Sequence, residues 1–275
     1  MVEQSLVDDL RLAHVLADNA DSLTMARFKA LDLRVSMKPD LTEVSDADVA
    51  VEELLRNNLY RTRPRDAVHG EEGHDTGWGP RRWVIDPIDA TRNFVRGVPV
   101  WATLIALMDG PDVVVGLVSA PALGRRWWAS VGHGAYTGKS LASASRMHVS
   151  AVSSVTDASL SYSSIHGWVD SGRGQQFVDL LRDCWRTRAY GDFWSYMLLA
   201  EGAVDIACEP DLALYDMAAL VPIVREAGGV FTNVDGAPGP VGPGALATNG
   251  LLHADVLRTL APGEPTQPMD FDVEV

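Results

Sequence analysis

Apolar and polar positions in the first half of the chain follow patterns that predict helices packed on a sheet. Apolar residues recur at helical spacing from about Leu6 to Ala30, and a second helix is predicted to end near Leu59. Ser45 stands three residues before Asp48, which is the spacing of a capping pair at the start of that second helix, after the polar loop KPDLTEVSDAD. Apolar runs of β-favouring residues predict strands at Val68–Gly70, Trp83–Ile85, Trp101–Met108, Val113–Ser119 and Arg126–Ser130.

Two details of these strands bear on the core and the site. Asp86–Pro87 is predicted to end the strand that begins at Trp83, because proline cannot donate to a strand ladder. Trp127 and Trp128 are adjacent strand residues, so their side chains should face opposite sides and pack in the core or at a dimer contact.

The second half alternates strands with helices, which favours an α/β layer. The predicted elements are strands at Ser159–Ser163, Val204–Ala207, Val230–Thr232 and Ala245–Thr248, and helices at about Gly174–Cys184, Phe193–Glu201, Tyr215–Ala227 and His253–Leu260. We therefore predict an N-terminal part, 1–145, that combines helices with a largely antiparallel sheet and carries most of the metal ligands. A C-terminal α/β part, 146–262, carries substrate residues, and 263–275 form a mobile acidic tail.

Charge and composition exclude several classes of function. The formal net charge of −14 repels phosphate backbones, so binding of nucleic acid through bulk charge is not expected. We expect no membrane span and no signal peptide, because the apolar runs are short and the start, MVEQSLVDDL, is acidic. Cys184 and Cys208 have no metal-ligand spacing, which favours free thiols in the reducing cytoplasm. An anionic substrate would then require a local positive charge, such as a bound divalent metal.

The densest chemistry lies in Asp86-Pro-Ile-Asp89-Ala-Thr91, which follows Gly70-Glu71-Glu72 by about fifteen residues. Mg²⁺ prefers oxygen ligands, and two carboxylates three residues apart can converge with the Ile88 carbonyl on one point. A short helix that starts after Asp89 would offer its unpaired N–H groups to a phosphate. The alternative is that Asp86 is a turn residue and Asp89 a helix cap.

These motifs occur in a specific order across about residues 5–260. GEE, WVIDPIDATRNF, LYDMAAL and REAGG resemble the inositol monophosphatase family of metal-dependent phosphatases, which is related to fructose-1,6-bisphosphatase. Within it, VRGVPVWATLIAL, SAPALGRRWWAS, RAYGDFWSY and AEGAVDIACEP look most like histidinol-phosphate phosphatases of the actinobacterial branch. The resemblance implies an α/β (α+β) fold of alternating αβαβα layers, a cytoplasmic enzyme and a homodimer.

The resemblance also implies roles for individual residues. Asp46 would act with the Thr91 hydroxyl to orient and deprotonate a metal-bound water. The implied ligands of two or three Mg²⁺ ions are Glu71, Asp86, the carbonyl of Ile88, Asp89 and Asp216. The residues implied to border the substrate are Glu71, Ile88, Asp89, Ala90, Thr91, Arg188, Asp192, Glu209 and Asp216.

Simpler roles remain open for several of these side chains. Asp46 could be an exposed acid in the first turn of its helix, and Asp192 or Asp216 could each cap a helix. Glu209 could be a loop charge, and Arg188 could pair with surface acids. Glu72 could order water behind the ligands or could simply be exposed.

Ala90 departs from the family, which normally has glycine between the aspartate and the threonine. If the position requires a positive φ, alanine costs about 1 kcal/mol or more. If the position is the first turn of a helix, alanine is compatible, and we favour this second interpretation because Thr91 and both aspartates are retained.

The function that these features favour is Mg²⁺-dependent hydrolysis of a small phosphate monoester by direct attack of water. L-Histidinol phosphate fits the acidic flank, because Glu209 and Asp192 could meet its ammonium and imidazole groups. The alternatives are an inositol 1-phosphate or broader sugar-phosphate phosphatase and, in another class, a catalytically weakened metal-binding regulatory relative.

Overall fold

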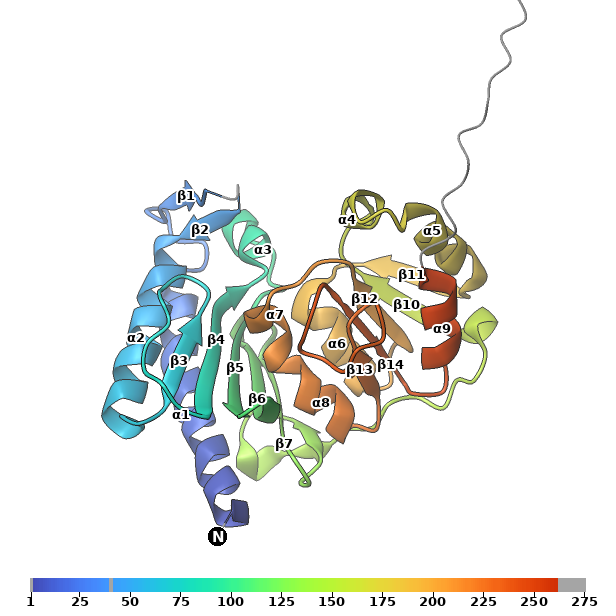
Figure 1. Ribbon diagram of the computed structural model, residues 1–275. Helices are drawn as coiled ribbons and strands as arrows, with labels where there is room; N and C mark the ends of the chain where they lie inside the picture. The colour runs from blue at the N-terminus through green and yellow to red at the C-terminus, as the bar shows by residue number, and fades with distance from the viewer. Residues whose placement is uncertain (1, 40–41, 262–275) are drawn as a thin grey trace, which may run out of the picture.

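Two main β-sheets lie between three layers of helices, which is the αβαβα order that the family resemblance implies (Figure 1). The computed structural model describes residues 2–39 and 42–261. The predicted acidic tail at 263–275 lies outside the described residues. Within the described ranges, no helix is both long enough and apolar enough to cross a membrane.

The larger sheet has seven strands in the order β3-β4-β5-β6-β7-β8-β9, and only the β3–β4 pair is parallel. Its strands are β3 (Ala67–Gly70), β4 (Arg81–Asp89), β5 (Ala102–Asp109), β6 (Asp112–Ala120), β7 (Arg125–Ser130), β8 (Ala135–Thr137) and β9 (Ser145–Arg146). The smaller sheet has five strands in the order β11-β10-β12-β14-β13. They are β10 (Ser159–Tyr162), β11 (Arg186–Ala189), β12 (Ile206–Glu209), β13 (Val230–Thr232) and β14 (Ala245–Thr248).

The helices form the outer and middle layers. Helices α1 (Val2–Arg27) and α2 (Asp46–Thr62) cover one face of the larger sheet, and a short hairpin, β1 (Val35–Met37) with β2 (Glu43–Ser45), connects them. The middle layer contains α6 (Asp192–Ala200), α7 (Leu214–Ala218) and α8 (Leu220–Glu226). The outer face of the smaller sheet carries α4 (Ile165–Asp170), α5 (Gly174–Asp183) and α9 (His253–Leu260). Helix α3 (Thr91–Arg96) follows β4 directly.

The two faces of the larger sheet pack against two different layers of helices. Trp128 is buried with α1 and α2, whereas its neighbour Trp127 is buried with α6 and α8 on the opposite face. The predicted opposite orientation of these two tryptophans is therefore confirmed. Gly116 of β6 allows the middle layer to approach closely, because a Cβ there would lie 2.3 Å from the carbonyl oxygen of Ala219.

Three of the predicted segments differ from their structure. Strand β4 does not end at Asp86–Pro87 but continues to Asp89 through a register shift opposite β5, so that Pro87 lies in a bulge. The single helix predicted at 215–227 is two helices, and Pro222 lies in the first turn of the second, where its missing N–H is tolerated. The predicted loop at 38–48 contains β2 and the first turn of α2.

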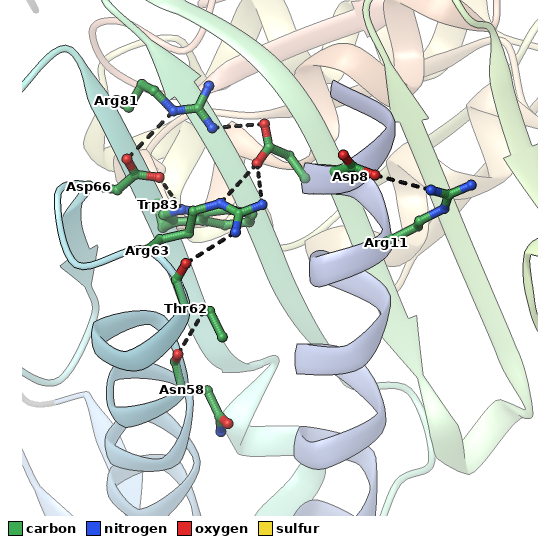
Figure 2. A network of polar contacts seen from close by, with 9 residues as sticks. Asp8, Arg11, Asn58, Thr62, Arg63, Asp66, Arg81 and Trp83 are labelled. Carbon is green, nitrogen blue, oxygen red and sulfur yellow. Dashed lines mark hydrogen bonds and ion pairs between the residues drawn. The ribbon is translucent and has the colours of Figure 1, made fainter. Parts of the chain in front are cut away.

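A network of buried and partly buried charges joins α1, the end of α2 and the start of β4 (Figure 2). Asp9 of α1 is almost fully buried and accepts hydrogen bonds from Arg63 at 3.0 Å and Arg81 at 2.8 Å. Arg81 also lies 3.6 Å from Asp66, which accepts the indole N–H of Trp83 at 3.0 Å. The network therefore fixes the outer helices on the edge of the larger sheet.

Replacing Asp9 with alanine should lower the free energy of unfolding by about 2–3 kcal/mol, because Arg63 and Arg81 would lose their buried counter-charge. Asp8→Ala is the matched control: it removes the neighbouring carboxylate, whose ion pair with Arg11 is exposed, and should cost less than about 0.5 kcal/mol. Urea unfolding of both variants measures the difference. Equal losses would contradict the structural role assigned to Asp9.

Candidate active site

A cavity of about 500 Å³ lies between the two sheets, bordered by the end of β4, the start of α3, the start of α6 and the end of β12. It brings together residues from both halves of the chain. Its lining is rich in carboxylates, namely Glu43, Glu71, Asp86, Asp89, Asp192, Glu209, Asp211 and Asp216. Of the residues that the sequence analysis assigned to the site, all but Asp46 and Arg188 line this cavity.

The bulge in β4 sets the positions of the first two carboxylates. Asp86 pairs in register with Leu104 and Asp89 with Ala102, so three steps along β4 oppose two along β5. Asp89 Oδ2 accepts the backbone N–H of Phe193 at 2.7 Å, which ties it to the start of α6. Asp86 is almost fully buried, and its Oδ1 has no hydrogen-bond partner among the described residues.

Asp216 completes a cluster that suits a divalent cation. Asp86, Asp89 and Asp216 each offer a carboxylate oxygen, and these three atoms lie within 4.8 Å of one another. Asp216 Oδ2 accepts the N–H of Ala213 at 2.7 Å, so this side chain both caps α7 and contributes to the cluster. Hard oxygen donors, a partnerless buried oxygen and uncompensated negative charge together fit Mg²⁺.

Burial and mutual repulsion make these carboxyl groups hard to ionise without a cation. Burial, followed by the charge of Glu71, raises the pKa of Asp86 well above its ordinary value, and burial and the charge of Asp192 do the same for Asp89. Burial raises the pKa of Asp216 to about 7. A bound cation would remove this repulsion and favour the ionised forms.

Glu71 is held beside this cluster by residues that the motifs did not reveal. The carboxylate of Glu52, on α2, accepts the backbone N–H groups of Glu72 at 2.7 Å and Gly73 at 2.8 Å. Gly70 leaves room for it, because a Cβ there would lie 2.5 Å from the Glu52 carboxyl group. Lys38 Nζ lies 2.7 Å from Glu71 and 2.6 Å from Glu72. Glu72 is therefore not simply exposed, and burial raises its pKa to about 7.

The carboxylate that contacts Thr91 is Asp48, not Asp46. Thr91 Oγ1 lies 3.2 Å from Asp48 Oδ1 and 3.0 Å from the Ile88 carbonyl oxygen. Asp48 is fully buried and also accepts the N–H and hydroxyl of Ser45, which completes the predicted capping pair. Asp46 is partly exposed and forms an ion pair with Arg27 at 3.0 Å.

Helical periodicity is the sequence signal that separates the two aspartates. Asp48 shares the inward face of α2 with Val51, Glu52 and Leu55, which follow it at spacings of three, four and seven. Asp46 falls outside this set. The contact with Thr91 that the sequence analysis predicted for Asp46 is therefore made by Asp48.

Asp192 and Glu209 also line the cavity. Asp192, the first residue of α6, follows the cap residue Gly191 and has φ +51°, so it is not the helix cap. Burial raises the pKa of Asp192 to about 6, against the charge of Arg92. Glu209 ends β12 and is almost fully buried, and its Oε1 has no partner of standard hydrogen-bond geometry among the described residues.

Arg188 does not belong to this cavity. It lies on the edge strand β11, is exposed, and donates to the carbonyl of its neighbour Thr187. Arg188 is therefore a surface residue, but among the described residues it forms no ion pair with an acidic side chain. Cys184 and Cys208 form no disulfide, as predicted.

Comparison with known proteins shows to which family the chain belongs. Residues 9–262 match the inositol monophosphatase family. The chain belongs to this family. A histidinol-phosphatase of Streptomyces coelicolor is 65% identical over 92% of this chain and 97% of its own length, and one of Mycobacterium tuberculosis is 56% identical over 93% and 99%. The solved inositol monophosphatase of Thermotoga maritima superposes with a TM-score of 0.82 at 27% identity, over 92% of this chain and 96% of its own.

Ala90 is the point at which this family member departs from the usual Asp-Gly-Thr motif. It has φ +67° and ψ +46°, and its carbonyl accepts the N–H groups of Asn93 and Phe94. Ala90 therefore caps α3 in the left-handed conformation and is not in the first turn, so our interpretation of this position was wrong. The bulge and the tight start of α3 impose this backbone, which glycine adopts more easily.

Ala90→Gly should leave the free energy of unfolding unchanged or raise it by up to about 1 kcal/mol, because relief of the left-handed strain offsets the added freedom of the unfolded chain. Ala50→Gly, inside α2, is the matched control and should cost about 1 kcal/mol. Thermal and urea unfolding provide the comparison. A loss at position 90 as large as at position 50 would contradict the strain argument.

Proposed function

We propose that this chain is a Mg²⁺-dependent phosphatase that hydrolyses L-histidinol phosphate to L-histidinol and phosphate. The observation that carries the proposal is the cavity itself, in which Asp86, Asp89 and Asp216 converge and which is also lined by the partly buried Asp192 and the buried Glu209. The three converging aspartates suit a cation that binds phosphate, and the further acids suit an organic portion with cationic nitrogen groups. The names and high identities of the Streptomyces and Mycobacterium relatives support this choice of substrate.

Two or three Mg²⁺ ions would be held by Asp86, Asp89 and Asp216, and by Glu71 with the Ile88 carbonyl. When bound, Mg²⁺ offsets the charge of the phosphate oxygens, stabilises the leaving alkoxide and lowers the pKa of coordinated water. Thr91 and Arg92, in the first turn of α3, line the cavity, so the backbone N–H groups at this helix start would be available to the phosphate. Lys38 adds positive charge beside Glu71.

Asp48 and Thr91 would handle the proton of the attacking water. The single hydrogen of the Thr91 hydroxyl can be donated either to Asp48 or to the Ile88 carbonyl. When it is donated to Asp48, the hydroxyl oxygen can accept a proton from water while Asp48 takes the hydroxyl proton. Burial raises the pKa of Asp48, which makes its carboxylate a better base than an exposed aspartate. No covalent phosphoenzyme is part of this proposal.

Glu209 and Asp192 would accept N–H donors from the ammonium and imidazole groups of the substrate. Burial and the charge of Asp192 raise the pKa of Glu209 to about 8, so its ionised form gains strongly from a cationic neighbour. A neutral polyol would leave part of this buried charge uncompensated. These acids therefore favour a cationic substrate over inositol 1-phosphate.

Phosphate release from a small panel of monoesters tests the proposal. With Mg²⁺, kcat/KM for L-histidinol phosphate should exceed that for inositol 1-phosphate by about tenfold or more, and EDTA should abolish both activities. Preference for inositol 1-phosphate would replace the proposed substrate with the alternative one. Background turnover at saturating Mg²⁺ that Ala90→Gly restores would support the regulatory alternative instead.

The ionisation of the site predicts a dependence of metal-induced stability on pH. Because the folded-state pKa values of Asp216 and Glu209 are raised to about 7 and about 8, the metal-free folded state binds more protons than the unfolded state between about pH 4 and pH 8. The contribution of Asp216 and Glu209 to the free energy of unfolding of the metal-free protein therefore falls as pH rises through that window. Mg²⁺ should raise the unfolding temperature by several degrees near pH 8 and by much less near pH 5.5. Thermal unfolding in Mg²⁺ and in EDTA provides the measurement, and an increase larger at the lower pH would contradict it.

We also propose that the chain forms a homodimer, as its family resemblance implies. Strand β11 is an edge of the smaller sheet, and the exposed side chains of Trp185 and Tyr190 flank it. An open strand edge with exposed aromatic side chains is suited to association. Light scattering after size-exclusion chromatography should give about twice the monomer mass of 29.7 kDa, and a monomer would contradict the proposal.

A further inference from the structure

The loop that carries Glu71 is closed at its base by hydrogen bonds between the residues on either side of it. Val68 and Thr76 exchange backbone hydrogen bonds at 2.8 and 3.0 Å, so residues 69–75 form a closed loop. Within it, the Nδ1–H group of His69 donates to Asp75 Oδ1 at 2.6 Å, because an ionised carboxylate can only accept. This hydrogen bond fixes the orientation of the imidazole ring.

The His69 ring extends from the larger sheet toward the middle layer of helices. Val68 packs with α1 and α2 and Gly70 lies against Glu52 of α2, so the side chain between them faces the opposite side of β3. There the imidazole stacks on the ring of Tyr215 in α7, with 6.2 Å between the centroids and 27° between the planes. This separation is within the range of offset aromatic stacking. The contact therefore joins the end of β3 to α7.

Each of the two rings lies next to a carboxylate of the cavity along the chain. Glu71 follows His69 by two positions, and Asp216 follows Tyr215 directly. Glu71 and Asp216 line the cavity, whereas neither His69 nor Tyr215 does. The two rings therefore act on a ligand in the cavity only through the carboxylates beside them.

A divalent cation at this site needs oxygen donors from the loop and from α7 at a set spacing. Mg²⁺ binds oxygen at about 2.0–2.1 Å in near-octahedral geometry, so a donor that moves by about 0.5 Å weakens its binding. From the side of α2, the Glu52 carboxylate holds the loop through the N–H groups of Glu72 and Gly73. The stack of His69 on Tyr215 holds the loop from the opposite face of the sheet. Together the two contacts fix the loop from both faces.

We propose that His69 is a positioning residue for the bound cation: its stacked ring joins the Glu71 loop to α7 and keeps Glu71 and Asp216 at the spacing that the cation requires. This inference rests on the metal site of the proposed function. Without the stack, the loop would lose its contact with α7, and the need to order it would oppose cation binding. The same oxygen donors remain, so the site should bind the cation more weakly but work normally once it is saturated.

Variants that separate the ring from its hydrogen bond test this inference. His69→Asn removes the ring but keeps an N–H donor for Asp75, whereas His69→Phe keeps a ring but removes the donor. The dissociation constant of Mn²⁺, measured without substrate from the electron paramagnetic resonance signal of the free ion, should rise about tenfold in His69→Asn and in Tyr215→Leu. It should rise less than about threefold in His69→Phe and stay within about twofold of wild type in Tyr215→Phe, which keeps its ring. His74→Ala, which replaces an exposed histidine of the same loop, is the matched control and should bind Mn²⁺ as the wild type does.

Steady-state kinetics distinguish positioning of the cation from a general loss of structure. With L-histidinol phosphate at saturating Mg²⁺, kcat of His69→Asn should stay within about threefold of wild type, while the Mg²⁺ concentration for half-maximal activity rises about as much as the dissociation constant of Mn²⁺. In a double-mutant cycle, Tyr215→Leu should add little to the weakened Mn²⁺ binding of His69→Asn. Because the two rings lie on separate elements, either variant tests the inference if the other does not fold.

Wild-type binding of Mn²⁺ is measured first. If the wild type binds no Mn²⁺, the proposed metal site is rejected and this inference with it. If the wild type binds Mn²⁺ and the two variants that lack a ring bind it equally well, the inference alone is rejected. Additive effects in the double mutant, or a loss of kcat at saturating Mg²⁺ as large as the loss of affinity, would also overturn it.

Discussion

Asp86→Asn is expected to reduce Mg²⁺-dependent phosphate release by roughly 10³-fold or more. The side chain is buried between Glu71, Asp89 and Asp216, and its Oδ1 has no hydrogen-bond partner among the described residues. Asparagine has nearly the same shape but lacks the charge that a divalent cation requires. The variant should therefore fold and lose its cation.

The stability of this variant provides an independent test. Since like charges surround Asp86, its neutralisation should leave the metal-free protein at least as stable as the wild type. Addition of Mg²⁺ should then raise its unfolding temperature much less than that of the wild type. Asp112→Asn, at an exposed strand end, should behave as wild type in both assays. If the activity of Asp86→Asn stays within about tenfold of wild type, Asp86 is not a ligand of the catalytic metal ion.

Asp48→Asn is expected to lower kcat by about 10²–10³-fold, whereas Asp46→Asn should change it by less than about twofold. Only Asp48 contacts Thr91, and only its charged form can accept a proton through that hydroxyl. Asp46 instead pairs with Arg27 at the edge of the site. The two variants remove the same charge two residues apart, so each controls for the other.

Steady-state kinetics with saturating Mg²⁺ and far-ultraviolet circular dichroism separate a catalytic loss from unfolding. Asparagine at position 48 retains an oxygen that can accept from Ser45, so the start of α2 should persist. A larger loss for Asp46→Asn than for Asp48→Asn would restore the assignment made from the sequence alone.

Much of the fold follows from local patterns that the sequence carries openly. The adjacent tryptophans Trp127 and Trp128 are buried on opposite sheet faces because a strand alternates its side chains. The Ser45–Asp48 pair starts α2 where the spacing predicted it. Short edge elements gave no such signal: β11 has the sequence Arg-Thr-Arg-Ala and is mostly exposed, so neither burial nor alternation marks it.

In the site, too, local sequence patterns locate some residues, whereas others can be recognised only from tertiary contacts. Four acids of the ordered motifs line the cavity: Glu71, Asp86, Asp89 and Asp216. Glu71 follows β3, the two aspartates lie in the last part of β4, and Asp216 lies in the first turn of α7, all in or next to elements that the pattern predicted. The positive φ of Ala90 depends on the bulge in β4, and the bulge is defined by pairing with β5, which local patterns do not report. Glu52 and Lys38 reach the Glu71 loop from distant segments, so their contribution becomes visible only in three dimensions.

Crystals grown with Mn²⁺ in place of Mg²⁺ test the central claim most directly, because anomalous scattering locates the ion without assumption. We expect an ion at about 2.0–2.2 Å from carboxylate oxygens of Asp86, Asp89 and Asp216, and its loss in crystals of the Asp86→Asn variant. Anomalous density elsewhere in an enzyme that Mn²⁺ activates, with these three side chains turned away from one another, would contradict the account.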